Sequence, residues 1–158
     1  MWWLKIISAV VLFAIVYQDL KYRAVSWFWF PILAIGLGTL HYLNSLFEVF
    51  VLHSLINLGF VLLILILLYA YISFRDKYKF SKAMGSGDVV MFIALSPAMA
   101  SITFIVCFIF SILLAMILSL VFNKKDKKNI PLAGYMAVFF TFIYLAYWNG
   151  FLTQLYTI

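Results

Sequence analysis

The sequence predicts an all-α membrane protein, a bundle of about six transmembrane helices. Its 158 residues are 68% hydrophobic and only 10% charged, whereas soluble domains are about 45–50% apolar and about 25% charged. A helix that spans a bilayer needs about 20 apolar residues, so the chain accommodates about five to seven spans. No stretch is long or polar enough for a separate globular domain, and we therefore predict that residues 1–158 form a single integral membrane domain.

Short polar segments divide the chain into six apolar runs. The first run ends at Asp19, and we expect it to be retained because it lacks the strong basic flank and small-residue cleavage site of a signal peptide. In the second run Ser26 is the expected N-cap, and Pro31 comes early enough to be tolerated. The fourth run is short, starting near Asp88 and ending near Pro97. We expect helices over residues 2–18, 26–43, 50–73, 88–98, 101–122 and 131–149.

The distribution of basic residues predicts which way the bundle faces. With six spans, alternate loops share a face, which gives ten of the eleven Lys and Arg residues to one face and only Lys5 to the other. The positive-inside rule then predicts cytoplasmic basic loops and puts both termini outside. The net charge of +6 therefore reflects topology and attraction to anionic lipid headgroups rather than nucleic-acid binding. The ten residues are Lys21, Arg23, Arg75, Lys77, Lys79, Lys82, Lys124, Lys125, Lys127 and Lys128.

Two of the five acidic residues stand at the ends of predicted spans. Asp19 closes the first span and Asp88 opens the fourth, so the predicted topology brings both to the cytoplasmic edge of the membrane. Glu48 belongs to the outer loop, and Asp76 and Asp126 lie within basic loops. A solvated surface position accounts for the charge of each of these three residues. Two carboxyl groups at one membrane depth indicate aspartyl protease chemistry.

Peptide hydrolysis by two aspartates requires that the pair share one proton. The ionised carboxylate activates water, and the protonated partner polarises the scissile carbonyl. Asp88 lies near a helix N-terminus, which favours the anion, and Asp19 near a helix C-terminus, which disfavours it. We therefore expect Asp88 to be the base and Asp19 the acid. Gly85 and Gly87, which have no Cβ, are expected to let the backbone turn sharply and a substrate strand approach closely.

Neither a metal nor an organic cofactor is expected. His41 and His53 flank the outer loop, with no third ligand near them and on the face away from the aspartates. Cys107 is the single cysteine, so it has no partner within the chain for a disulfide or a zinc site.

Three segments occur in an order that matches a known family. They are Asp19–Ser26, Gly85–Val89 and Ile130–Gly134. On these segments, and over nearly its whole length, the chain resembles the type IV prepilin peptidases, membrane aspartyl proteases of the Gly-x-Gly-Asp class. It departs from the family at Val90, where Lys is frequent, and at Trp27, where Asn is common. Both departures concern substrate fine-tuning rather than the two aspartates.

The resemblance implies a function and a set of site residues. It implies an endopeptidase of the bacterial inner membrane that acts at the cytoplasmic face, serving type IV pili or protein secretion. The substrates would be prepilin- or pseudopilin-like membrane proteins, cut after a short basic leader. Asp19 and Asp88 would be catalytic and Gly85 and Gly87 supporting residues. Lys21 and Arg23 would bind headgroups or steady the dyad and the substrate.

The single cysteine also bears on the reaction. Long members of the family carry a cysteine-rich cytoplasmic insert and methylate the new N-terminus. The chain has no such insert, so the resemblance implies a short form that acts as a peptidase only.

Two alternatives stay open: a related protease acting on other membrane helices, and a small transporter whose aspartates relay protons. The sequence does not indicate an oligomeric state.

Overall fold

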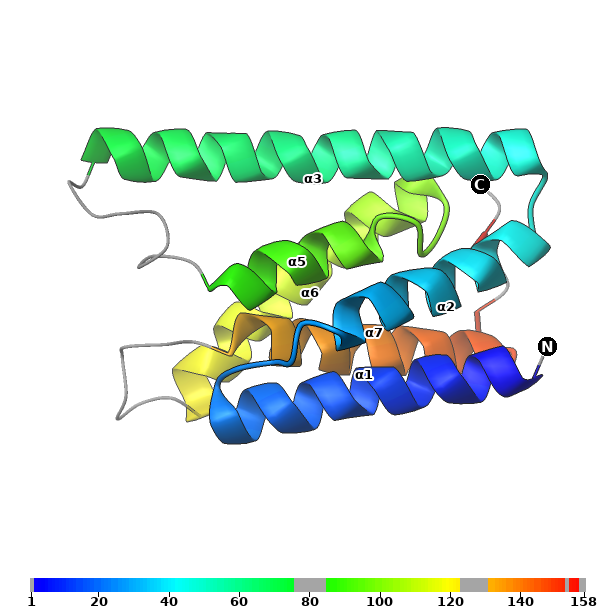
Figure 1. Cartoon of the computed structure of the whole chain (residues 1–158), viewed down its shortest axis with the longest axis horizontal. Coiled ribbons are helices and arrows are strands. Elements are labelled where there is room, and N and C mark those ends of the chain that lie inside the picture. Colours follow the sequence, from blue (N-terminus) through cyan, green and yellow to red (C-terminus); the bar gives the residue numbers. More distant parts are fainter. Residues whose placement is uncertain (1, 76–84, 123–130, 153, 157–158) are drawn as a thin grey trace.

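The computed structural model describes residues 2–75, 85–122, 131–152 and 154–156, and this part of the chain is helical without strands (Figure 1). The prediction of an all-α fold is confirmed. The predicted basic residues of the two longer loops lie outside the described residues, as does the side chain of Arg75. The helices are α1 (Trp2–Tyr22), α2 (Trp29–Leu43), α3 (Phe47–Arg75), α5 (Ser86–Leu95), α6 (Ser101–Phe122) and α7 (Leu132–Trp148).

Three of these helices are long and apolar enough to cross a membrane. They are α1, α3 over Phe47–Phe74, and α6 over Ser101–Val121. The helices α2, α5 and α7 are also apolar but shorter, with 10 to 17 residues each. Helices able to cross a membrane are thus present, while the count of six spans and the orientation stay predictions.

The first helix runs further than predicted, and this changes the setting of Asp19. α1 continues to Tyr22 instead of ending at residue 18, so Asp19 and Lys21 lie in its last turn. The Arg23 amide donates to the Asp19 carbonyl oxygen at 2.9 Å. Arg23 has a positive φ of 52°, and the left-handed conformation ends the helix there.

The predicted N-cap of the second helix is wrong. α2 begins at Trp29 rather than at residue 26, and Phe28 occupies the cap position. The Ser26 carbonyl accepts the Trp29 amide at 3.2 Å, and the Ser26 amide donates to Gln18 Oε1 at 2.9 Å. The segment between α1 and α2 is thus tied back onto α1. Pro31 lies in the first turn of α2, as expected.

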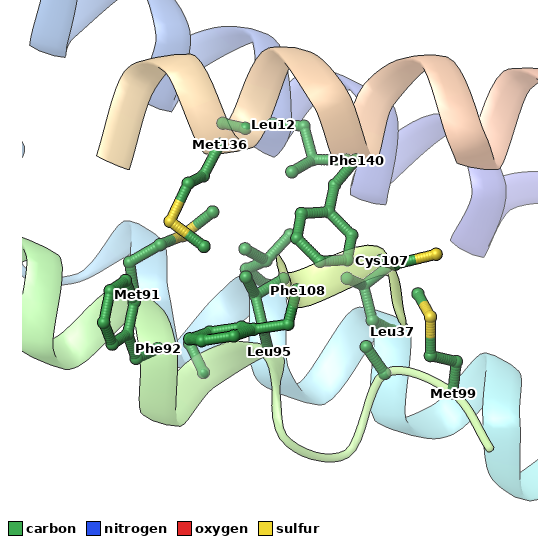
Figure 2. Close-up of a cluster of buried hydrophobic side chains, with 14 of the residues drawn as sticks. Leu12, Leu37, Met91, Phe92, Leu95, Met99, Cys107, Phe108, Met136 and Phe140 are labelled. Atoms are coloured by element: carbon green, nitrogen blue, oxygen red, sulfur yellow. The ribbon is translucent and has the colours of Figure 1, made fainter. Parts of the chain in front are cut away.

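The hydrophobic core gathers around α7, which packs against α1, α5 and α6. In Figure 2, Leu12 of α1, Leu37 of α2 and Phe140 of α7 point into the same cluster as side chains of α5 and α6. The rings of Phe92 and Phe108 meet edge to face with centroids 4.9 Å apart. In a membrane bundle, close van der Waals packing of such side chains holds the helices together.

The long helix α3 lies along one side of the bundle and leaves most of its apolar surface uncovered (Figure 1). It contacts α6, α5 and α2. Asn57, fully buried on α3, donates from Nδ2 to the Ser96 and Met99 carbonyl oxygens, both at 2.9 Å. This side chain fixes α3 to the turn between α5 and α6.

The helix ends that matter for function lie at one end of the bundle. The C-terminal end of α1 and the N-terminal ends of α5 and α7 gather there (Figure 1). Trp2 and the described C-terminal segment lie at the opposite end, as does the connection between α2 and α3. The two predicted catalytic residues thus come from helix ends that lie together.

Candidate active site

Asp19 stands in the last turn of α1, where α7 covers it. Its side chain is buried, with 6% of its surface exposed. Carboxylate Oδ2 accepts the backbone N–H of Gly134 at 2.5 Å. The acceptor and donor are 115 residues apart in the chain, so this bond joins the first helix to the last. A carboxylate with this little solvent depends on such a donor.

Asp88 stands in the first turn of α5 and is half-buried. Gly85 is the N-cap of the helix, and its carbonyl oxygen accepts the Asp88 amide at 3.1 Å. The Asp88 carboxyl lies close to Gly85 at the start of its own helix. Its Oδ1 accepts the backbone N–H of Ala133 at 2.9 Å, so Asp88 also reaches α7.

The two carboxyl groups therefore bind adjacent amides of a single helix turn. Consecutive amide nitrogens in helical backbone are about 2.8 Å apart. With the two hydrogen bonds, this spacing keeps the bonded oxygens of Asp19 and Asp88 within about 8 Å of each other. At this separation, ionisation of one carboxyl opposes ionisation of the other. This arrangement favours a pair that holds one proton between two carboxyls.

The N-terminus of α7 changes the electrostatic argument about acid and base. The first amides of a helix lack intrahelical acceptors and carry partial positive charge. Each carboxyl accepts a hydrogen bond from one of these amides: Asp19 from that of Gly134 and Asp88 from that of Ala133. The disadvantage of Asp19 at the C-terminus of α1 is thus offset, and the expected division into base and acid stays a prediction.

The two glycines of the Gly-x-Gly-Asp segment differ in the space around them. Gly85 has an extended backbone with φ −66°. Gly150 is the glycine with a positive φ in the described part of the chain. The residues before Gly85 lie outside the described part of the chain, so the expected sharp turn into α5 stays a prediction. A Cβ on Gly85 would lie 3.1 Å from Asp88 Oδ2, whereas one on Gly87 would lie 3.8 Å from Phe30 Cζ.

Lys21 lies on an exposed stretch of α1 and contacts aromatic side chains. Its ammonium group donates to the Tyr17 hydroxyl at 2.6 Å and stands over the rings of Tyr17 and Tyr22. These contacts fit an interfacial position better than a position beside the dyad. Arg23 follows the helix end on the exposed side of the chain.

Two residues of the site were missed by sequence reasoning. Ala133 and Gly134 bind the aspartates through backbone amides, which leave no side-chain signature. The segment Ile130–Gly134, the third on which the family resemblance rests, could have pointed to these two residues, but the sequence assigned it no role in the site. Ile130 lies outside the described residues, and Pro131 is the buried N-cap of α7.

The two histidines lie together at the other end of the bundle. Their rings stack with centroids 5.7 Å apart, and His41 Nδ1 is 3.0 Å from the Pro97 carbonyl oxygen. Within the described ranges no group of three His, Cys, Asp or Glu side chains is placed to hold a metal ion.

Comparison with known families settles the relationship of this chain. A sequence model of the type IV leader peptidase family matches residues 6–122, well over half of the chain. The chain belongs to the type IV leader peptidase family. As a member of this family it is a peptidase, and both Asp19 and Asp88 lie within the matched residues. The match ends before α7. No curated protein and no solved structure gives a significant match.

Proposed function

We propose that this leader peptidase is an aspartic endopeptidase that uses Asp19 and Asp88 as its catalytic pair. The observation that carries the proposal is that both carboxyls bind adjacent amides of α7, Gly134 and Ala133. Helix ends far apart in the sequence thereby bring two acids into one site. Membership of the leader peptidase family supports hydrolysis over proton relay as the use of this pair.

The pair supports general acid–base hydrolysis. One ionised carboxylate takes a proton from water as the water oxygen adds to the scissile carbonyl carbon, and the protonated partner donates to the carbonyl oxygen. The proton taken from water then passes to the amide nitrogen and the C–N bond breaks. The proton on the former carbonyl oxygen returns to its carboxylate, which restores the singly protonated pair.

The proposed substrates are prepilin- or pseudopilin-like proteins that carry a basic leader before an apolar helix. The proposed site is the cytoplasmic face of a bacterial inner membrane, with both termini outside. The helix ends that carry Asp19 and Asp88 gather at one end of the bundle (Figure 1), which supports a site at the membrane edge, where such a leader meets its helix. The uneven distribution of Lys and Arg supports the orientation.

A reconstituted assay tests this function. The purified protein in lipid vesicles is mixed with a prepilin containing its leader and first helix, and products are identified by mass spectrometry. We expect one cut between leader and helix. Asp19→Asn and Asp88→Asn each keep the shape of the side chain and remove its ionisation, so each should lower kcat at least about 1,000-fold.

Three results would refute parts of the proposal. Full activity in either Asn variant would exclude the dyad mechanism. Cleavage of unrelated membrane helices at rates equal to the prepilin would replace the substrate class by the broader alternative. Proton transport through vesicles without peptide cleavage would favour the transporter alternative.

A further inference from the structure

The first turn of α7 holds the two carboxyls of the proposed dyad in register. α7 begins after the buried Pro131, with Leu132 as its first residue. The next two amides, those of Ala133 and Gly134, each donate to a different aspartate on a different helix. Three helices from the start, middle and end of the chain thus meet at two consecutive peptide groups.

Gly134 is tightly enclosed against Asp19. A Cβ on Gly134 would stand 2.9 Å from Asp19 Cβ, 3.0 Å from its Oδ2 and 3.4 Å from its Cγ. The closest of these atoms is attached directly to the α1 backbone, so it cannot move aside by a simple side-chain rotation. Any side chain at this position would push α1 away from α7 or displace the Asp19 carboxyl. Glycine is therefore the residue that lets α7 approach Asp19 closely enough for the 2.5 Å hydrogen bond.

We propose that Ala133 and Gly134 are positioning residues whose backbone amides set the spacing and shared ionisation of Asp19 and Asp88. This inference rests on the proposed function and extends it to a part of the chain beyond the family match, which ends at residue 122. The amides favour the singly ionised pair because each donates to a carboxylate and carries the positive end of the α7 dipole. Misplacing either carboxyl by about 1 Å is expected to cost about 100-fold in rate.

The substitution Ala133→Pro removes one of these donors without a change of charge. Proline is tolerated in the first turn of a helix because the amide there has no intrahelical acceptor. α2 carries Pro31 in its own first turn. The matched control is Ile102→Pro, since Ile102 is the second residue of α6, as Ala133 is of α7, and is exposed. We expect kcat to fall about 100-fold in Ala133→Pro with KM within about twofold of wild type.

The substitution Gly134→Ala tests the close approach. Its matched control is Gly59→Ala on α3, where an added Cβ meets nothing within 4 Å. We expect Gly134→Ala to lower kcat at least about 100-fold and Gly59→Ala to leave it unchanged. In any residual activity, the acidic limb of the rate–pH profile should move to higher pH, because a carboxylate that loses an N–H donor holds its proton more tightly.

The experiment measures kcat, KM, the rate–pH profile and the melting temperature for these four variants together with Asp19→Asn and Asp88→Asn. Inactive Asn variants beside active Ala133→Pro and Gly134→Ala would overturn the positioning role while keeping the dyad. Active Asn variants would overturn the dyad itself. Equal losses in Ala133→Pro and Ile102→Pro, or losses that follow melting temperature alone with an unmoved pH profile, would reduce α7 to a structural element and refute the inference.

Discussion

At the scale of single residues, the site depends on the absence of a Cβ atom at two glycines. Gly85 leaves room beside Asp88 Oδ2, and Gly134 leaves room beside Asp19. Neither position needs the left-handed backbone that glycine alone adopts readily, since neither has a positive φ. The sequence indicated that Gly85 and Gly87 matter and offered a sharp turn as the reason, whereas the structure adds the space that Gly85 leaves beside Asp88. Steric space around a carboxylate depends on neighbours that a local motif does not reveal.

A pair of alanine substitutions separates the two glycines of the Gly-x-Gly-Asp segment. In Gly85→Ala the new Cβ lies 3.1 Å from Asp88 Oδ2, which must shift by a few tenths of an ångström. In Gly87→Ala it makes an ordinary contact at 3.8 Å with Phe30. We expect Gly85→Ala to lower kcat by about tenfold and Gly87→Ala by less than about twofold, measured by prepilin cleavage. A larger loss in Gly87→Ala would contradict this account of the segment.

At the scale of helices, the apolar runs predicted the elements well, because a helix that packs in a bilayer or a core must be apolar along its length. Their ends were predicted less well. α1 runs on to Tyr22, and α2 starts at Trp29, after a segment in which the Ser26 amide is bound to Gln18 of α1. Such ends depend on tertiary hydrogen bonds. The role of α7 was not predicted because its donors are backbone amides, which leave no pattern in the side chains.

The hydrogen bonds of Asn57 predict a stability effect that leaves catalysis intact. Asn57→Ala removes the donor to the Ser96 and Met99 carbonyl oxygens, which lie at the bundle end away from the dyad. Leaving buried carbonyls unpaired should lower the free energy of unfolding by about 2 kcal/mol or more. Thermal unfolding in detergent measures the loss. The exposed Asn149, which donates to the Leu145 carbonyl oxygen, supplies the control, and Asn149→Ala should cost less than about 1 kcal/mol. Equal effects of both substitutions would contradict the account.

At the scale of the whole molecule, the sequence predicted that two distant aspartates lie at the same membrane depth on one face. That prediction came from counting charges on alternate loops, which requires only that the spans reverse direction each time. In the structure the carboxyls of Asp19 and Asp88 accept amides from one turn of α7, so the two residues lie close together. The packing of α3 along the side of the bundle (Figure 1) was not predictable, since its uniformly apolar surface gives no direction to its contacts.

Chemical labelling tests the predicted orientation of the bundle. In a Cys107→Ala background, which removes the single cysteine, Leu46→Cys and Ala24→Cys place exposed thiols at opposite ends of the bundle. A membrane-impermeant maleimide added to intact spheroplasts should label Leu46→Cys and spare Ala24→Cys until the membrane is opened. The reverse pattern would invert the topology and remove the site from the cytoplasmic face.

The central claim is that Asp19 and Asp88 form one site, and cross-linking measures this most directly. Asp19→Cys and Asp88→Cys are combined in the Cys107→Ala background and treated with a bifunctional thiol reagent that spans about 8 Å, the limit set by two hydrogen bonds to adjacent amides. The chain is then cut between α3 and α5, and the account predicts that the two fragments stay joined. The pair Leu46→Cys with Asp88→Cys also lies on the two different fragments, but at opposite ends of the bundle, so its fragments should separate. Separation of the Asp19 and Asp88 fragments, although each single cysteine reacts, would contradict the account.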